Sequence, residues 1–294
     1  TWLLSAIEGP TPVSALLHAA TIVTAGVFLL LRRAPIFLQA PVTAELVTFF
    51  GAITAFFAGV CGLVQHDIKK IIALSTCSQL GYIFYACGLI QFQLGLFHLI
   101  THAFFKALLF LCAGAIIHAF SGEQDLRRMG GALWQIPITY ISIIFASLAL
   151  IGFPFLSGFY SKDRILEVAW ASSFLFQEQF KIGLLAYWIT SLAAIFTVLY
   201  SFRLLYWVFF SSPTSHPLTI KNLQETDETI LIIFRFLLLG SLFLGYFLKD
   251  LFGGIRSDIN FFYVFSNYSI ANLDIIELLF ISEFIPIYIK FLPI

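Results

Sequence analysis

The chain has 294 residues, of which 60% are hydrophobic and only 11% are charged, and its formal net charge is zero. About a quarter of the residues in a soluble domain are charged, because its whole surface meets water. The composition therefore excludes an ordinary soluble domain and places the chain among membrane proteins. The zero net charge gives no electrostatic reason to expect nucleic acid as a partner.

Apolar stretches long enough to cross a bilayer recur along the chain, since a spanning helix needs about 20 mostly apolar residues. The opening TWLLSAI is too short to span, and EGPTP at 8–12 separates it from the next helix. We expect roughly eight helical segments, at 11–31, 43–64, 68–90, 93–120, 136–152, 183–210, 229–248 and 275–294. The sequence therefore predicts an all-α, polytopic transmembrane helix bundle.

The fifth segment is expected to be discontinuous. It runs into FPFLSG at 153–158, where Pro154 and Gly158 break a helix in mid-membrane, and Lys162 and Asp163 follow at once. Interrupted helices expose backbone groups and dipole ends, and transporters place ion sites at them. Lys162 and Asp163 are therefore candidate site residues. The alternative interpretation is a lysine that extends along the apolar surface to reach water.

The fourth segment contains HLITHAFFKALLFLCAG, in which His98, His102 and Lys106 follow one another at i, i+4 and i+8. This spacing places them on one helix face. Histidine titrates near neutral pH, and a desolvated lysine can lose its charge as well. The pattern predicts a file of proton-exchanging groups. Two alternatives stay open: a metal bound by the HxxxH pair, and a purely structural hydrogen-bonded core.

Further polar residues lie inside or at the ends of apolar segments. His18, in VSALLHAATIVTAG, either joins helices by a hydrogen bond or extends the file. A second stripe, in LSTCSQLGY, either holds water or packs helices. The secondary polar candidates are Ser75, Ser78, Gln79 and Tyr82 on that stripe, with Asp67 and Lys69 before it. The simpler interpretation of Asp67 and Lys69 is that they are interface charges.

The four cysteines, Cys61, Cys77, Cys87 and Cys112, stand in apolar stretches without CxxC spacing. We interpret them as small hydrophobic residues rather than as ligands of an iron–sulfur cluster. No residue pattern indicates a flavin, a haem or an iron–sulfur cluster. We therefore expect the chain itself to bind no cofactor and no metal.

Four separate stretches, in order, resemble one known family. They are EGPTPVSALLHAATIVTAGVFLL, HDIKKIIALSTCSQLGY, HLITHAFFKALLFL and GFYSKDRILE. They resemble NADH dehydrogenase subunit 5, the antiporter-like, proton-pumping membrane subunit of mitochondrial complex I. The resemblance is strong over about residues 1–210 and weak beyond them.

This resemblance implies an antiporter-like fold of two inverted five-helix repeats, each with one broken helix. Residues 1–32 would end the first repeat, 43–208 would form the second, and 228–294 would be peripheral C-terminal helices. His18 would match the linking histidine of the family. His98, His102 and Lys106 would match its central file, and Lys162 and Asp163 the site at its second broken helix.

The resemblance further implies a proton-translocating subunit of respiratory NADH:ubiquinone oxidoreductase, multi-pass in the mitochondrial inner membrane. NADH, FMN, iron–sulfur clusters and ubiquinone would be bound elsewhere in the complex. The partners would be membrane lipid and other membrane-arm subunits of complex I. The alternatives are a subunit of a multisubunit cation/proton antiporter, and a structural half-subunit without its own proton path.

Some features of the family fall outside this sequence. The glutamate and the broken-helix lysine of the first repeat would lie before Thr1, and the long lateral helix would follow Ile294. We therefore expect either a segment of a longer protein or a split gene, in which a separate chain supplies the N-terminal half.

Overall fold

The computed structural model describes residues 9–17, 21–175, 183–215, 217–221, 223–253 and 285. Within these residues every regular element is a helix, and the only extended pairing is an isolated bridge between Asp67 and Asp125. The predicted all-α fold is therefore confirmed. The predicted segment 275–294, apart from Ile285, and the opening TWLLSAI lie outside the described residues.

Five of the described helices are long and apolar enough to cross a membrane. They are α5 (Pro41–Val64), α6 (Ile68–Gly88), α7 (Phe92–Ala119), α10 (Gly183–Leu205, prolonged by the π-turn η5, Tyr206–Phe210) and α12 (Glu228–Gly253). Their bounds lie within a few residues of the predicted ones, because each is one uninterrupted apolar run.

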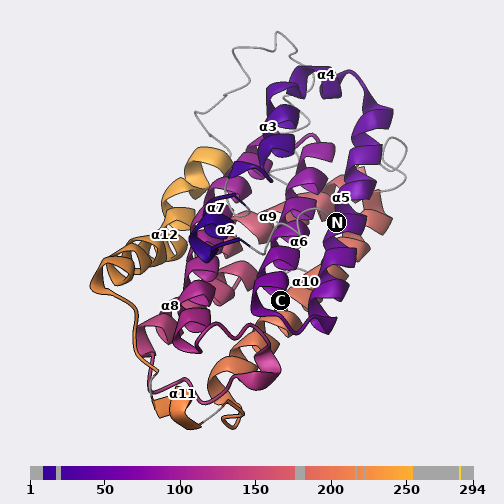
Figure 1. Cartoon of the computed structure of the whole chain (residues 1–294). Coiled ribbons are helices and arrows are strands. Elements are labelled where there is room, and N and C mark those ends of the chain that lie inside the picture. Colours follow the sequence, from indigo (N-terminus) through magenta and orange to yellow (C-terminus); the bar gives the residue numbers. More distant parts are fainter. Residues whose placement is uncertain are drawn as a thin grey trace.

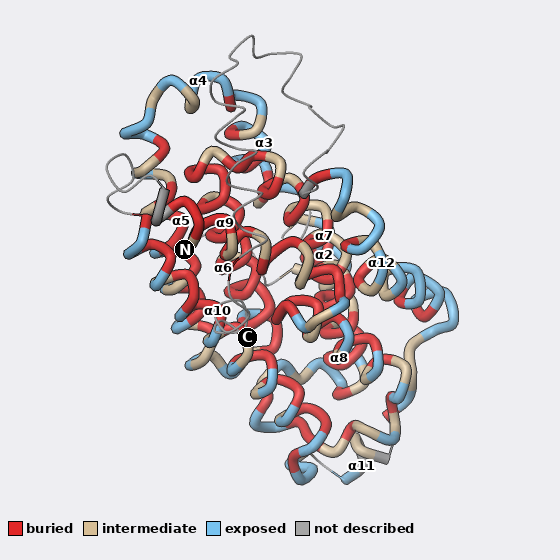
Figure 2. Tube along the Cα trace, turned by 180° about the vertical axis from the view of Figure 1, so that it is seen from behind, coloured by how far each residue is buried: buried red, intermediate tan, exposed pale blue. Residues whose placement is uncertain are grey.

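Helix α6 forms the centre of the bundle, and α5 and α12 lie on opposite sides of it (Figures 1 and 2). In the most apolar stretch of α6, 89% of the residues are buried, against 22% in that of α12. Helix α6 packs against α5 and α7, whereas α12 covers α7 and α8. The outer face of α12 exposes large apolar side chains such as Phe236 and Phe247, which suits contact with lipid.

The predicted continuous helix at 11–31 is wrong. The structure has two short helices there, α2 (Thr11–Leu16) and α3 (Ala25–Arg32), with a turn at 22–24. The Ile22 amide donates to the Leu17 carbonyl, five residues earlier instead of four. The Thr24 hydroxyl donates to the Thr21 carbonyl at 2.9 Å.

Within the described part of the chain, further short helices lie outside the predicted segments. They include α4 (Ala34–Leu38), the 3₁₀ turn η3 (Leu126–Arg128) and α11 (Pro217–Lys221).

The predicted break in the fifth segment is confirmed. Helix α8 (Pro137–Ile151) ends at Gly152, whose φ of +101° is a left-handed conformation that glycine adopts without steric cost. After residues 152–158 the chain continues as the π-turn η4 (Phe159–Asp163) and helix α9 (Arg164–Leu175). With its 15 residues, α8 is about 22 Å long. It is therefore too short to cross a hydrocarbon core of about 30 Å and ends inside it.

Helices α5 and α6 approach each other backbone to backbone through glycines. A Cβ atom at Gly51 would lie 2.6 Å from the Tyr85 amide nitrogen, and one at Gly81 would lie 2.6 Å from the Ala55 amide nitrogen. Neither backbone can move aside as a flexible side chain could. Small residues at helix contacts allow this close packing in membranes.

Replacing Gly81 should separate α5 from α6 and destabilise the bundle. We expect Gly81→Ala to lower the free energy of unfolding by about 1–3 kcal/mol, the usual cost of overpacking. Thermal unfolding in detergent measures this change. Gly26→Ala is the matched control, since its Cβ would meet only the tip of the Phe84 ring, at 3.3 Å. Equal unfolding midpoints for the two variants would contradict the packing argument.

Candidate functional site

Three ionisable side chains lie in a row along α7 in the interior of the protein. His98, His102 and Lys106 are each 0% exposed. From His98 to Lys106 the row extends roughly 12 Å along the helix axis. Burying such groups costs several kcal/mol unless polar partners compensate. The contacts of each group therefore decide what it can do.

Lys106 is held by oxygen atoms of α6. Its ammonium group donates to the Ser75 hydroxyl and, at 3.3 Å, to the Ile72 carbonyl. No carboxylate forms an ion pair with Lys106 among the described residues. Neutral oxygens can accept a hydrogen bond from the ammonium group without compensating its charge. The charge of Lys106 can therefore change without breaking an ion pair.

His98 joins α6 to the broken helix. Its Nε2 lies 3.0 Å from the Gln79 Oε1, and its Nδ1 lies 2.9 Å from the Ser161 Oγ. An amide oxygen only accepts, so Nε2 carries the hydrogen, and Nδ1 of the neutral ring accepts from Ser161. The Ser161 Oγ is also 3.0 Å from the Thr101 Oγ1, so it has a second polar partner.

His102 differs from its neighbours on α7. Neither of its ring nitrogens has a hydrogen-bond partner within the described part of the chain. Its ring centre lies 6.1 Å from that of His98 and 5.4 Å, edge to face, from that of Phe105. A buried imidazole without polar partners is costly. We therefore expect water molecules beside this ring.

Lys162 occupies the break between α8 and α9 and is 1% exposed, so it does not reach the surface of the protein. Its ammonium group donates to the Ile151 carbonyl at 3.0 Å and to the Thr197 hydroxyl at 3.1 Å. It also lies 5.2 Å from the centre of the Tyr82 ring. A helix C-terminus carries partial negative charge, and an aromatic face attracts cations. The break between α8 and α9 thus surrounds the Lys162 ammonium group with groups that stabilise its charge.

Asp163 points to the turn that ends α8 and is 8% exposed. A Cβ at Gly152 would lie 3.1 Å from its Oδ1. Its Oδ2 has no hydrogen-bond partner among the described residues, and the structure forms no ion pair between Asp163 and Lys162. Its free oxygen is the second place in the site where we expect water.

The structure thus brings the predicted residues of α6, α7 and η4 together. The Ser78 Oγ is 3.5 Å from the Tyr200 hydroxyl, and Tyr82 donates to the Thr190 carbonyl at 2.8 Å. His18 lies outside the described residues.

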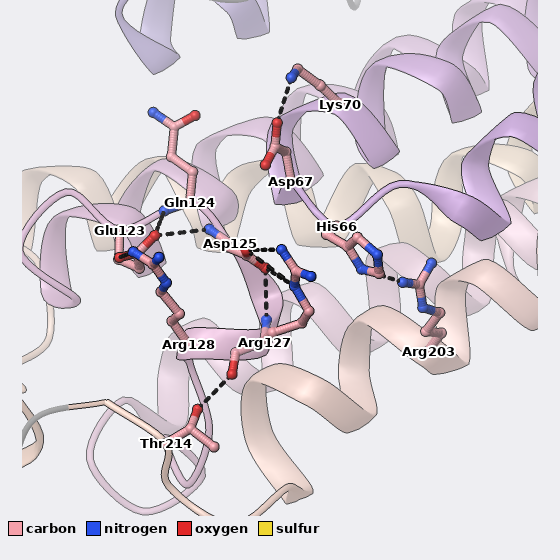
Figure 3. Close-up of polar contacts among 10 residues, drawn as sticks. All are labelled: His66, Asp67, Lys70, Glu123, Gln124, Asp125, Arg127, Arg128, Arg203 and Thr214. Carbon is pink, nitrogen blue, oxygen red and sulfur yellow. Dashed lines mark hydrogen bonds and ion pairs between the residues drawn. The ribbon is translucent and has the colours of Figure 1, made fainter.

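Asp67 and Lys69 lie at the start of α6, apart from this cluster. Lys69 is 6% exposed and donates to the Gly9 carbonyl at 3.3 Å, so it is buried rather than a surface charge. Asp67 forms an ion pair with Lys70 at 2.6 Å. Figure 3 shows Asp67 within a polar network that also contains the pairs Asp125–Arg127, Glu123–Arg128 and His66–Arg203.

This network holds the loop before α8 against the start of α6. The Ile68 amide donates to the Gln124 carbonyl at 3.1 Å, and the Leu126 amide to the His66 carbonyl at 2.9 Å. Hydrogen bonds from the Arg127 guanidinium hold the pKa of Asp125 at about 2, so its carboxylate stays charged near neutral pH. The network therefore serves the structure of the loop.

Three residues that contact the site residues were not among the candidates predicted from the sequence. They are Ser161, Thr197 and Tyr200. Ser161 stands next to Lys162 in the sequence. Thr197 and Tyr200 belong to α10, where Thr190, Thr197 and Ser201 share one face of an otherwise apolar helix. This stripe of hydroxyl side chains was the sequence signal that could have shown that α10 contributes to the site.

Among the described residues no three His, Cys, Asp or Glu side chains come together as ligands for a metal ion. The histidine pair of α7 has a glutamine, a serine hydroxyl and a phenylalanine around it instead. The two imidazole rings can bind and release protons, and the glutamine and the serine orient the ring of His98.

Comparison with known proteins gives consistent matches. Residues 1–183 match the family described as NADH:quinone oxidoreductase/Mrp antiporter, TM. The chain is 50% identical over 293 residues to NADH-ubiquinone oxidoreductase chain 5 of Phytophthora infestans. It is 49% identical over 294 residues to that of Acanthamoeba castellanii. In both cases the match covers 100% of this chain but only 42% of the relative.

A solved structure is similar as well. It is the structure of the Mrp complex from Dietzia sp. DQ12-45-1b, with a TM-score of 0.74 and 25% identity. The similarity covers 98% of this chain and 32% of that chain.

The two histidines should respond differently to the same substitution. His98→Leu leaves the Gln79 Oε1 without its partner, and a buried group left unpaired costs about 1–3 kcal/mol. His102→Leu removes no protein hydrogen bond and should change the free energy of unfolding by less than about 1 kcal/mol. Thermal unfolding of both variants in detergent measures the difference. A larger loss for His102→Leu would contradict the assigned contacts.

Proposed function

Since the chain belongs to the NADH:quinone oxidoreductase/Mrp antiporter transmembrane family, we propose that it translocates protons as a membrane-arm subunit of respiratory NADH:ubiquinone oxidoreductase. The main support is the continuous row of buried groups on α7 and its link, through Ser161, to the broken helix. The names of the relatives support the assignment to that complex. We place the chain in the mitochondrial inner membrane.

Lys106 is the first group of the proposed path. It releases a proton as its ammonium group becomes an amine, and Ser75 can remain its partner because a hydroxyl both donates and accepts. The proton moves along α7 through His102, the middle member of the relay. Water completes this part of the path, since the ring of His102 has no polar partner among the described residues.

His98 then binds the proton at Nδ1. The Ser161 hydroxyl, which donates to the neutral ring, turns and accepts from the charged ring instead. The next cation site is Lys162 at the break, with Asp163 beside it. Thr197 and the Ile151 carbonyl hold the Lys162 ammonium group while it is charged. We propose that Lys162 and Asp163 control the release of the proton.

The remaining parts of the subunit are proposed from the family. His18 links this path to the preceding repeat, residues 1–32 end that repeat, and 43–208 form the second. Residues 228–294 are peripheral. Other chains of the complex bind NADH, FMN, the iron–sulfur clusters and ubiquinone, and this chain carries no redox centre. Its neighbours are lipid and other membrane-arm subunits. The N-terminal half of the subunit is provided either by a separate chain or by the same, longer polypeptide.

A cation/proton antiporter subunit is the second candidate. The similar solved structure is an Mrp complex, and the similarity covers 98% of this chain. The higher identity to the complex I relatives, 50% against 25%, favours the respiratory complex. A third possibility is a half-subunit that only supports the membrane arm.

Lys106→Met tests the proposal directly. Methionine keeps the volume of the side chain but binds no proton, so we expect transport through this chain to stop and fewer protons to be pumped per NADH oxidised. Vesicles containing the assembled complex allow this measurement. Lys70→Met is the control, because Lys70 is exposed at the start of α6 and pairs with Asp67. Unchanged pumping by an assembled Lys106→Met complex would refute the relay and favour the purely structural role.

The composition of the native assembly separates the two transport candidates. Mass spectrometry of the intact assembly should find flavin and iron–sulfur subunits with this chain. If only small membrane proteins accompany it, the antiporter assignment is the correct one.

A further inference from the structure

Helix α8, the first half of the broken helix, has no cap of its own at its first turn. The side chain of Ile136, the residue before it, makes no hydrogen bond to the helix, and Pro137 has no amide hydrogen. The first amides of a helix find no acceptor within it. Those of Ile138 and Thr139 therefore need an acceptor from another part of the chain.

Glu225, in the segment between α11 and α12, is that acceptor. Its Oε1 accepts from the Ile138 amide at 2.7 Å and from the Thr139 amide at 3.2 Å. Its Oε2 accepts from the Thr139 hydroxyl at 2.8 Å. A helix N-terminus carries partial positive charge, which favours a carboxylate there. One side chain, 86 residues away from Thr139 along the sequence, therefore caps α8.

The opposite end of α8 holds Lys162. The carbonyl of Ile151, the last residue of the helix, accepts from the Lys162 ammonium group at 3.0 Å. Between the two ends, the Ser142 and Ser147 hydroxyls donate to carbonyls of α8 itself. The helix thus lies between a carboxylate at its N-terminus and an ammonium group at its C-terminus, the arrangement that its dipole favours.

Helix α12 connects these two ends. It begins at Glu228, directly after the segment that carries Glu225, and packs against α7 and α8 (Figure 1). Further along, it covers the break, where a Cβ at Gly245 would lie 2.7 Å from the Ser157 carbonyl oxygen. Helix α12 and the segment before it therefore contact both the start of α8 and the break that follows its end.

We propose that Glu225 is a positioning residue that fixes α8 along its axis and so keeps the Ile151 carbonyl within reach of Lys162. The inference rests on the proposed function, in which Lys162 controls the release of the proton. Glu225 itself neither binds nor transfers that proton. It acts on Lys162 through α8, over about 20 Å along the helix axis.

The hydrogen bond from Lys162 to Ile151 tolerates little displacement. Such bonds are effective up to about 3.2 Å, so a shift of α8 by about half an ångström along its axis weakens this one. Apolar contacts with α7 and α12 hold α8 sideways, but burial of apolar surface has no preferred direction. The directional bonds from the first turn to the Glu225 carboxylate set the position along the axis, and a charged acceptor strengthens them.

Other charged or titratable groups surround Lys162, and a substitution at position 225 leaves them in place. They are Asp163 in η4, Tyr82 of α6, His98 of α7, the Arg164–Glu167 pair of α9, and Lys249 of α12 with Tyr160. A change in the pH dependence of pumping therefore reports on the Ile151 carbonyl.

Glu225→Ala in the assembled complex tests the positioning role. It removes all three hydrogen bonds to the first turn of α8. We expect fewer protons per NADH, and the alkaline limb of the pumping profile should move to lower pH by about one unit, because the Lys162 ammonium group loses one of its two acceptors. Loss of stability alone would reduce the amount of assembled complex and leave the limb in place.

Glu225→Gln separates the position of α8 from the charge at its start. The amide oxygen keeps the bonds from both backbone amides, and the Thr139 hydroxyl can accept from the new NH₂ group. We therefore expect a profile close to that of the wild type. Asp227→Ala is the matched control and should also leave the profile unchanged. It removes an exposed acidic side chain from the same segment but keeps the backbone carbonyl that accepts from the Ile230 amide.

The outcomes separate this inference from the proposed function. An unmoved limb in an assembled Glu225→Ala complex, with pumping lost in Lys106→Met, overturns the positioning role and leaves the relay standing. A limb displaced as far in Glu225→Gln as in Glu225→Ala also overturns it, because charge rather than position would then act. Unchanged pumping in Lys106→Met overturns both.

A second variant covers the case in which Glu225→Ala does not assemble. Thr139→Val removes one of the three hydrogen bonds at nearly constant volume. It should move the same limb to lower pH by roughly half a unit. An unmoved limb in Thr139→Val overturns the positioning role.

Discussion

The absence of water from the hydrocarbon core of a bilayer is the constraint on which this structure depends. Every polar group buried there must find its partner within the protein or keep water with it. Lys106 therefore bonds to a hydroxyl and a carbonyl of α6, and Lys162 to the carbonyl end of α8. His102 lacks a protein partner among the described residues. This single requirement explains why Lys106 and Lys162 are held by protein oxygen atoms, and why we expect water beside His102.

The same constraint connects helix packing to the site. The glycine contact of α5 and α6 brings α6 into the centre of the bundle, where Ser75 and Gln79 meet α7. The break after Ile151 supplies the carbonyl that a continuous helix would have used internally. Helix α12 packs over the break, since a Cβ at Gly245 would lie 2.7 Å from the Ser157 carbonyl oxygen. Close helix packing thus places the polar groups and separates them from lipid.

Much of the fold could be predicted because apolar runs and helix breakers act locally. The spans near 43–64, 68–90 and 93–120 follow from apolar runs, and the break at 153–158 follows from its proline and glycine. The shared face of the α7 residues follows from their spacing of four. The interruption at 22–24 could not be predicted from hydropathy, because Ile22, Val23 and Thr24 continue the apolar run and include no proline or glycine. The partners on α10 were missed for another reason. Tyr200 and Thr197 meet α6 and η4 only through tertiary packing, and one helix's periodicity does not say which helix faces it.

The most direct measurement is an electron cryomicroscopy map of the native assembly that resolves ordered water. A hydrated proton path predicts water within hydrogen-bond distance of both ring nitrogens of His102 and of the Asp163 Oδ2. It also predicts water that joins Lys106 to His98 along α7. A dry, apolar environment around His102, with no water between Lys106 and His98, would contradict proton transfer along this helix.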